Sequence, residues 1–556
     1  MKRALPLFLA ATSALVAARA QEAVGPRGRI LEAASFAAPL RVFAVPLEAR
    51  ALERFADPTK AQIYVAAREA PQLDVARDGA FALPSDGAGA RVVCGYADLD
   101  GDGRWSPSAS EPFGWCVAPD SLRWRHVTHT TPPVELVIRL RAPRCLKNRE
   151  RRVENGALRW MHGLPVVQLR GDARQRGFAH GALLAAQIVD FLRFYVIEDR
   201  LGSAAAYAEF TRFLESHYAP PELYAAECQA VLEGMRSTGV DLALAELGRA
   251  FELVDLYAIN GYIETRAMQS SCTQFAAWGE RTRGTDVDGG MIAGRNMDGE
   301  CDVRRVTVSH CVIFAVQPSE PGSKRYVSVM WPGFVGTLSG LNEDGFYLME
   351  NAGLTGPGPI VERMIPLSWT MREALARCGA ETTPRELLAF VQRYANAAGG
   401  SCGPGGILLA ALPYREQAQP AFVLEGDRFG AALRVAGEVA PEIPQVLLAS
   451  NHPRRYGVDP REPELVFGKR PSFSSLWRYQ AGAQKLEAWH RAGRAIGTYE
   501  MKELLQLVAQ GTTEHAIVVR PDRLELEVAL ASMAAEPWDA PYRAWRGFTF
   551  DELFER

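Results

Sequence analysis

Cys272 lies in a stretch whose residue types suit nucleophilic chemistry. A predicted strand runs from Ser270 to Trp278, and a second one, from Met291 to Asp298, follows a polar turn rich in Gly and Asp. Two strands joined in this way pair as a hairpin, which places Cys272 beside Arg295 and Asp298. A guanidinium next to a thiol favours the thiolate, which is the reactive form of cysteine. The stretch therefore predicts a nucleophilic cysteine flanked by an Arg/Asp pair.

The predicted hairpin meets this requirement only under one geometric condition. Side chains alternate between the two faces of an unbroken strand, so Arg295 and Asp298 would point in opposite directions. A strand end or a β-bulge between them would bring both toward Cys272. Without it, the same residues describe a core cysteine and a surface ion pair, and this interpretation stays open.

Further stretches with distinctive polar residues or glycines follow one another along the chain. They are Arg176 to Ala185, the run around Cys272 with Gly294 to Asp298, Gly340 to Gly345, Ser450 to Pro453 and Ser475 to Tyr479. Taken in this order, they resemble the isopenicillin N acyltransferase-like family and, more distantly, choloylglycine hydrolases and penicillin V acylase. These are N-terminal-nucleophile hydrolases, and the resemblance covers roughly residues 160 to 550.

The resemblance implies an α+β fold, a four-layer αββα sandwich, and a precursor that cuts itself between Ser271 and Cys272. The Cys272 thiol would attack the preceding carbonyl, and water would resolve the thioester. The new α-amine, with an ordinary pKa of about 7.7–8.0, would then accept the thiol proton. Many family members carry an acidic residue or glycine at the position of Ser271, and this chain departs from that pattern.

The resemblance also assigns roles to residues around the nucleophile. Asp298 matches the carboxylate at the nucleophile's amine, and Arg295 matches the guanidinium beside the sulfur. Asn451 matches the asparagine that helps to hold the oxyanion of the tetrahedral intermediate. Arg478 matches the arginine that completes the polar network, and Asn351 aligns with a second oxyanion contributor.

The elements that must position these residues follow from hydrophobic periodicity. Residues 155–271 form an α-rich first part of the catalytic precursor, and residues 272–556 form its catalytic β-chain, in which strands alternate with helices. Helices are predicted over 182–192, 204–218, 221–237, 242–262, 367–377, 384–395 and 499–509. Strands are predicted over 306–316, 326–331, 346–350, 407–412, 421–425, 446–449 and 516–519.

The N-terminal part predicts an export signal and a separate β domain. Lys2 and Arg3 precede an apolar run that ends in an Ala-x-Ala cleavage site at Ala20, which is typical of a signal peptide over residues 1–20. We therefore expect an exported protein, periplasmic or extracellular, without stable membrane insertion. Residues 28–145 contain short alternating runs such as 61–65, separated by Pro, Gly and Asp turns, which favours an N-terminal all-β sandwich.

A loop in this domain has the residue types of a cation site. Asp98, Asp100 and Asp102 alternate with glycine turns at Gly101 and Gly103. Carboxylate oxygens at this spacing suit Ca²⁺, so the loop predicts a calcium site. A solvated turn without metal is the alternative, and cysteine catalysis itself requires no cofactor.

Composition and missing motifs exclude several classes of function. With 62 Lys+Arg against 65 Asp+Glu and a net charge of -3, the chain offers no basic footprint for nucleic acid. Its length of 556 residues and its 48% hydrophobic content allow two to four domains. No H-E-x-x-H or phosphate-loop motif is present.

The sequence leaves three interpretations of function. The first is a self-processing cysteine amidohydrolase or acyltransferase that acts on a small-molecule N-acyl substrate, with its α- and β-chains associated after cleavage. A phospholipase B-like esterase is the second, because the helix around Arg176 also resembles that branch. The third is a non-catalytic secreted protein that binds calcium or glycan and carries a degenerate hydrolase domain. Cys402, in a glycine loop without an Arg/Asp partner nearby, is a rival thiol.

Overall fold

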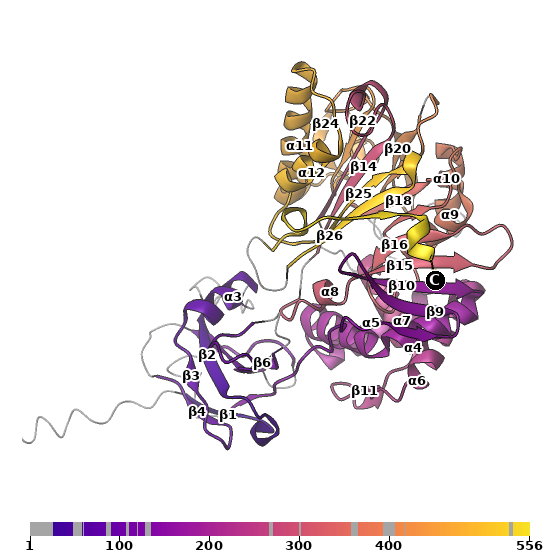
Figure 1. The fold of residues 1–556 in the computed structure, drawn as a ribbon. Helices are drawn as coiled ribbons and strands as arrows, with labels where there is room; N and C mark the ends of the chain where they lie inside the picture. Colours follow the sequence, from indigo (N-terminus) through magenta and orange to yellow (C-terminus); the bar gives the residue numbers. More distant parts are fainter. Residues whose placement is uncertain are drawn as a thin grey trace, which may run out of the picture. The chain divides into compact units, whose positions relative to one another are not determined.

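The computed structural model divides into two compact units, Met1–Pro143 and Arg144–Arg556, whose elements are labelled in Figure 1. The structure describes residues 26–47, 58, 60–84, 90–106, 111–118, 121–127, 135–265, 271–299, 302–356, 365–392, 406–417, 419–532 and 538–555. The predicted signal peptide and Cys402 lie outside the described residues.

Two small sheets in the N-terminal unit share an apolar core. Their strand orders are β4-β1-β7 and β3-β2-β5-β6. Ile30, Val42, Val93 and Leu136, which come from both sheets, are buried in one cluster. The strands are β1 (Arg27–Ile30), β2 (Leu40–Pro46), β3 (Leu73–Asp74), β4 (Ala80–Ala82), β5 (Arg91–Ala97), β6 (Phe113–Trp115) and β7 (Leu136–Ile138).

Residues 61–65, predicted as a strand from their alternation, belong to a helix instead. Helix α3 spans Lys60–Glu69, and Ile63, Ala66 and Ala67 are buried in it. Their spacing of three and four residues is that of one helix face. Ala, Lys, Arg and Glu dominate the segment and have high helix propensity, so the helical period overrides the short alternation.

A series of helices follows the first strands of the second unit, within the segment predicted to be rich in helices. They are α4 (Ala173–Asp190), the π-helix η3 (Phe191–Leu201), α5 (Ala204–His217), α6 (Glu222–Arg236) and α7 (Leu253–Thr265). The prediction of a helix over 242–262 is wrong in its first half, where Ala243–Leu244 (β11) pairs with Arg249–Ala250 (β12). Gly248 has a φ of 63° at this hairpin, a conformation that glycine adopts without strain and that a continuing helix excludes.

Among the described residues, one stretch is long and apolar enough to cross a membrane. It is Ala173–Leu201, the combined α4 and η3 segment, and 83% of its apolar window is buried inside the protein. A core helix passes the same test of length and composition.

Helices α4 and α6 approach each other closely because glycines lie at their contact. A Cβ on Gly181 of α4 would lie 1.9 Å from the backbone oxygen of Val231, and one on Gly234 of α6 would lie 2.1 Å from that of Phe178. A Cβ on Gly177 would meet the backbone oxygen of Glu227 at 2.4 Å. The glycines of the Arg176 to Ala185 stretch therefore serve backbone-to-backbone packing.

This packing predicts a large penalty for a single methyl group. Gly181→Ala should lower the free energy of unfolding by about 1–3 kcal/mol, because the two helix backbones must separate. The matched control is Gly547→Ala, where a Cβ has only an ordinary contact at 3.8 Å. Chemical denaturation of both variants checks the prediction, and equal stability of the two would contradict it.

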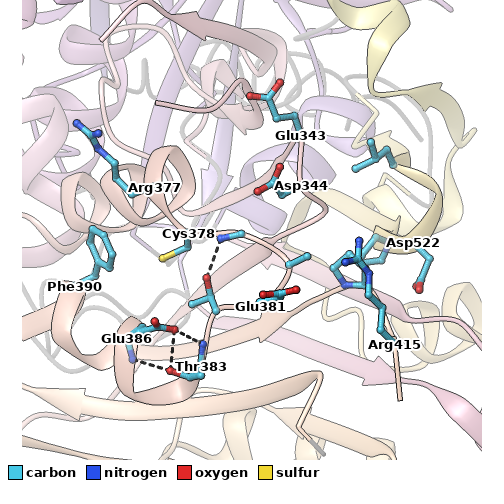
Figure 2. A pocket seen from close by; sticks show the side chains of 16 residues that line it. Glu343, Asp344, Arg377, Cys378, Glu381, Thr383, Glu386, Phe390, Arg415 and Asp522 are labelled. Carbon is cyan, nitrogen blue, oxygen red and sulfur yellow. Dashed lines mark hydrogen bonds between the residues drawn. The ribbon is translucent and has the colours of Figure 1, made fainter. Parts of the chain in front are cut away.

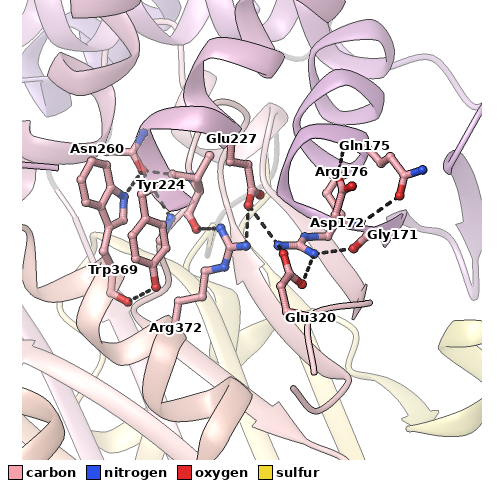
Figure 3. Close-up of polar contacts among 12 residues, drawn as sticks. Gly171, Asp172, Gln175, Arg176, Tyr224, Glu227, Asn260, Glu320, Trp369 and Arg372 are labelled. Atoms are coloured by element: carbon pink, nitrogen blue, oxygen red, sulfur yellow. Dashed lines mark hydrogen bonds and ion pairs between the residues drawn. The ribbon is translucent and has the colours of Figure 1, made fainter. Parts of the chain in front are cut away.

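A buried ion network joins α4 and α6 to later parts of the unit (Figure 3). Arg176 pairs with Glu320 at 2.7 Å and with Glu227 at 3.2 Å, and Glu227 also pairs with Arg372 at 2.7 Å. Two cations thus alternate with two carboxylates, which compensates charges that would be costly to bury alone. Arg176 is therefore a structural residue in this fold.

Two larger sheets form the body of the second unit. One has the order β21-β20-β19-β18-β17-β16-β15-β10-β9-β8 and the other β22-β13-β14-β25-β26-β27. The first contains β8 (Arg151–Val153), β9 (Gly156–Met161), β10 (Leu164–Gly171), β15 (Val312–Pro318), β16 (Tyr326–Met330), β17 (Ser339–Asn342), β18 (Tyr347–Ala352), β19 (Gly406–Ala411), β20 (Ala421–Asp427) and β21 (Gly430–Arg434). The second contains β13 (Ser271–Ala277), β14 (Ile292–Asp298), β22 (Val446–Ala449), β25 (Thr513–Arg520), β26 (Glu525–Leu530) and β27 (Arg546–Thr549).

The two sheets contact each other through β13 with β18 and through β20 with β22. Helices α4, α9 (Leu367–Arg377) and α10 (Pro384–Gln392) pack on the ten-stranded sheet, whereas α11 (Phe473–Arg491) and α12 (Thr498–Leu507) pack on the six-stranded one. Phe275, Leu448, Leu486 and Leu505 belong to one buried cluster between the second sheet and its helices. The chain is thus a mixed helix and sheet protein, which confirms that part of the fold prediction.

The predicted strand over 306–316 begins later than expected. Val306–Ser309 forms the short helix α8, and strand β15 starts only at Val312. The carboxylate of Asp302 accepts hydrogen bonds from the backbone N–H groups of Arg304 and Thr307. A side chain that satisfies the first backbone donors in this way favours a helical turn over an extended chain.

Candidate active site

The candidate site lies on the central strands of the six-stranded sheet. Strands β13 and β14 pair antiparallel, with Cys272 opposite Met297 and Ser271 opposite Asp298. Strand β25 flanks β14 on its other side. The predicted strand, turn and strand around Cys272 are therefore present.

The register irregularity beside Asp298 lies in the neighbouring strand and not in the hairpin itself. Met297 pairs with His515 and Asp298 pairs with Thr513, so the extra residue, Glu514, belongs to β25, whereas β13 and β14 pair in unbroken register. Asp298 is the last residue of β14. Arg295 contacts the Cys272 sulfur and Asp298 accepts from β25 and Gln510, so the two side chains of the predicted Arg/Asp pair have separate partners.

Arg295 reaches the sulfur of the candidate nucleophile. Its Nη2 donates to Cys272 Sγ at 3.4 Å and lies 3.1 Å from Met297 Sδ. The same guanidinium donates to the backbone oxygens of Leu338, at 2.7 Å, and Glu350. Arg295 is fully buried, so these partners hold it in one orientation beside the thiol.

Burial opposes ionisation of this thiol in the uncut chain. Cys272 is 1% exposed, and burial raises the pKa of its thiol, although Arg295 acts in the opposite direction. The sequence suggested a thiolate from the neighbouring guanidinium alone. In the structure the desolvation of the charged form is the larger effect, so Cys272 is a neutral thiol here.

Asn451 and Arg478 contact the backbone of Cys272. The Cys272 N–H donates to Asn451 Oδ1 at 2.8 Å, and Arg478 Nη1 donates to the Cys272 carbonyl at 2.5 Å. Arg478 Nη2 also donates to Asn451 Oδ1 at 2.8 Å, and Nη1 donates to Thr273 Oγ1 at 2.7 Å. The structure therefore brings both predicted residues to the nucleophile, 179 and 206 positions along the chain from it.

The amide nitrogens expected to hold an oxyanion are engaged elsewhere in the uncut chain. Asn451 Nδ2 donates to the backbone oxygen of Ala352 at 2.8 Å. Asn351 Nδ2 donates to the backbone oxygens of Ala449 and Ser450 at 3.3 and 3.0 Å. Both asparagines thus lie at the site, and in this state they link β18 to the end of β22.

Asp298 is held by two residues that the sequence did not indicate. Thr513 Oγ1 donates to Asp298 Oδ1 at 2.5 Å, and Gln510 Nε2 donates to Oδ2 at 3.1 Å. Burial raises the pKa of Asp298 to about 6, while Arg478 lowers it. Strand pairing of β14 with β25 was the missing information, because it places Thr513 opposite Asp298.

Glu350 is a further titratable group that the sequence did not assign. It precedes Asn351 on β18 and is 8% exposed. Burial raises the pKa of its carboxyl to about 7, and Arg295 lowers it. Glu350 also raises the pKa of the Cys272 thiol, so a negative charge on Glu350 disfavours the Cys272 thiolate.

The acidic loop of the N-terminal unit has a different membership from the predicted one. Ligand oxygens of Asp98, Asp100 and Glu111 lie within 4.8 Å of one another. Asp102 instead accepts the backbone N–H of Arg104 at 2.7 Å. Asp98 already pairs with Arg41 at 2.9 Å. Glu111, which was not among the predicted ligands, accepts the N–H of Leu99, twelve positions earlier in the chain. Calcium binding by this loop stays a prediction.

A cavity of about 850 Å³ elsewhere in the second unit shows no comparable chemistry among its described lining residues (Figure 2). Three of its carboxylates already have partners. Glu343 pairs with Arg325 at 2.7 Å, Asp344 pairs with Lys324 at 2.7 Å, and Asp522 accepts the backbone N–H of Met291 at 2.6 Å. The described residues that line this cavity include neither the candidate nucleophile nor its polar partners.

Comparisons with known proteins find structural likeness only. No model of a known protein family and no curated protein matches the chain. An N-acylethanolamine-hydrolyzing acid amidase ortholog from Caenorhabditis elegans is 15% identical, with a TM-score of 0.31 over 45% of this chain and 93% of that one. A variant of conjugated bile acid hydrolase from Clostridium perfringens is 12% identical, with a TM-score of 0.33 over 51% of this chain and 95% of that one. Penicillin V acylase from Agrobacterium tumefaciens is 12% identical, with a TM-score of 0.26 over 47% of this chain and 83% of that one.

These neighbours are named as an amidase, a hydrolase and an acylase. The identities and TM-scores are too low to transfer an activity or a residue role to this chain. Function is therefore inferred from the contacts around Cys272, and membership of the isopenicillin N acyltransferase-like family is a proposal.

Proposed function

We propose that the protein is a self-processing cysteine hydrolase or acyltransferase of the N-terminal-nucleophile type, acting on linear N-acyl amides through a Cys272 thioester. One observation carries the proposal. Arg295 contacts the Cys272 sulfur, while Asn451 and Arg478 contact the N–H and the carbonyl of the same residue. A cysteine whose thiol and backbone both contact polar side chains is organised for chemistry at its own peptide bond.

Self-cleavage follows from this arrangement. The Cys272 sulfur attacks the carbonyl carbon of Ser271, the S–C bond forms as the C–N bond breaks, and the thiol proton passes to the departing nitrogen. Water then hydrolyses the thioester, which leaves a carboxylate on Ser271 and restores the Cys272 thiol. Asn451 Oδ1 already accepts from the nitrogen that becomes the α-amine, and it is placed to hold that amine afterwards.

The same residue then acts on substrate. The free α-amine takes the thiol proton, the thiolate attacks the N-acyl carbonyl, and the protonated amine of the substrate leaves. Water hydrolyses the acyl-thioester, or a second amine accepts the acyl group. We assign the polar contacts of Asp298 to the α-amine, and we assign stabilisation of the oxyanion to Asn451 and Asn351 once cleavage frees their amides.

The layer order of helices, two facing sheets and helices supports assignment to the four-layer αββα sandwich. Strand β10 precedes residue 271 yet pairs parallel with β15, from Val166 opposite Ile313 to Gly171 opposite Pro318. Cleavage at Cys272 leaves this ladder intact, so we expect the α- and β-chains to stay associated. We also propose export, from the signal-like residues 1–20.

An esterase and a non-catalytic binding protein are less well supported. Arg176, which suggested the esterase branch, lies in the buried ion network and so carries no sign of substrate choice. Hydrolysis of N-acyl amides but not lipid esters by the purified protein would separate these interpretations. A binding protein would show neither activity.

Intact mass and N-terminal sequencing of the protein purified from an exporting host test the proposal. We expect two co-purifying fragments, one ending at Ser271 and the other beginning with Cys272. A single uncut chain without amidase activity would contradict it.

A further inference from the structure

The two charged groups at the candidate scissile bond are joined by a chain of neutral side chains. Arg478 Nε donates to Ser474 Oγ at 3.3 Å, and Ser474 Oγ donates to Gln510 Oε1 at 2.6 Å. Gln510 Nε2 then donates to Asp298 Oδ2 at 3.1 Å. At the ends, Arg478 contacts the Cys272 carbonyl and Asp298 lies opposite Ser271 in the strand register. The two ends of this hydrogen-bonded chain therefore lie on either side of the 271–272 peptide bond.

We propose that Gln510 and Ser474 are positioning residues that hold Asp298 and Arg478 at this bond. The inference rests on the proposed self-cleavage and extends it to residues to which the family resemblance assigns no role. Buried opposite charges attract strongly, and a direct Arg478–Asp298 pair would withdraw Arg478 from Cys272 and Asn451. A neutral amide and hydroxyl between them satisfy both groups while keeping each at its own end of the bond.

The direction of each hydrogen bond makes this role specific. Arg478 only donates and an ionised Asp298 only accepts, so the bridge must accept at one end and donate at the other. The Ser474 hydroxyl and the Gln510 amide do both. Ser474 lies in the first turn of α11, and Gln510 lies just after α12. Both side chains are only partly buried, so their main contribution is this hydrogen-bonded contact and not packing of the core.

The variants that test the proposal change the bridge without removing the residues it holds. Gln510→Met keeps the size but cannot donate, and we expect self-cleavage to slow by at least about tenfold. Ser474→Ala should act in the same direction, and Ser474→Thr should restore most of the rate. Gln510→Glu places a like charge on Asp298 and should raise the midpoint of the acidic limb of the cleavage rate by about one pH unit or more.

The matched control is Gln506→Glu, one helical turn earlier, whose amide donates to the backbone oxygen of Pro541. It should leave the cleavage rate and the midpoint of its acidic limb unchanged.

The other charged or titratable groups that act on Asp298 are Arg478 on α11, Asp539 before η6 (Ala540–Tyr542) and the Cys272 thiol on β13. All of them stay the same in these variants. A merely structural bridge would lower the melting temperature and leave the pH midpoint in place, which would overturn the proposal.

A second readout does not depend on cleavage. In a Cys272→Ala background, the stability difference made by Asp298→Asn as a function of pH reports the titration of Asp298. Gln510→Glu should move that titration upward and Gln506→Glu should not. If the wild type stays uncut, the proposed function fails, and this titration alone decides the role of Gln510. If Gln510→Glu leaves the titration of Asp298 in place, the proposed role of Gln510 is overturned.

Discussion

Cys272→Ala is expected to leave the chain uncut and without amidase activity. The sulfur is both the attacking atom of self-cleavage and the carrier of the acyl group, so no other residue of the site replaces it. We expect a loss of processing below detection, whereas Asn451 and Arg478 keep their backbone contacts with residue 272 because neither uses its side chain. Intact mass and N-terminal sequencing of the variant measure the outcome.

The matched control is Cys311→Ala. Cys311 is as buried as Cys272, at 1% exposed, and burial also raises the pKa of its thiol. However, Arg295 donates to the Cys272 sulfur, whereas the Cys311 sulfur lies 3.8 Å from His515 Nδ1. Normal processing in Cys311→Ala, together with none in Cys272→Ala, would identify the nucleophile. Processing in both would exclude Cys272.

Glu350→Gln is expected to make the uncut protein more stable at high pH. Burial raises the pKa of Glu350 from 4.5 to about 7, so the folded state binds this proton more tightly than the unfolded state. The resulting stabilisation is complete below pH 4.5 and is lost as the pH rises through about 7. A shift of this size corresponds to roughly 3 kcal/mol, which the neutral glutamine does not lose.

This prediction is measured in a Cys272→Ala background, so that one uncut chain unfolds. The unfolding free energy of Glu350→Gln relative to its parent should rise by about 3 kcal/mol between about pH 4 and about pH 8. Glu386→Gln is the control with the opposite sign, because hydrogen bonds from Thr383 lower the pKa of Glu386. Its stabilisation is lost as the pH falls. A flat difference for Glu350→Gln would show that its carboxyl is not strained by burial.

Local pattern in the sequence was sufficient for much of the fold around the site. The strand, turn and strand from Ser271 to Asp298 and the helices α5, α6, α9, α10 and α12 appear close to their predicted ranges, whereas α4 begins nine residues before its predicted start. Apolar periodicity and turn residues act over a few positions, so they can be read from the chain. The error at α3 arose because strong helix formers outweigh a short alternating run. At β11 a glycine turn interrupts the predicted helix, and at α8 the Asp302 side chain accepts backbone N–H groups of a helical turn.

Long-range contacts decided the chemistry of the site. The hairpin alone placed Arg295 near Cys272, and the alternation of faces required a strand end or a β-bulge for Asp298 to join them. Only the tertiary structure showed that Arg478 and Asn451 form hydrogen bonds with the Cys272 backbone, and that Gln510 connects Asp298 to the same network. These partners come from separate elements whose packing no local pattern encodes.

The protonation of the site also belongs to the tertiary structure. An adjacent guanidinium can be read from the sequence, and it predicts a thiolate at Cys272. Desolvation depends on every element that excludes water, and here the two sheets and α11 together bury Cys272, Asp298 and Glu350. The sequence determined which groups can ionise, whereas the surrounding fold decided at what pH they do so.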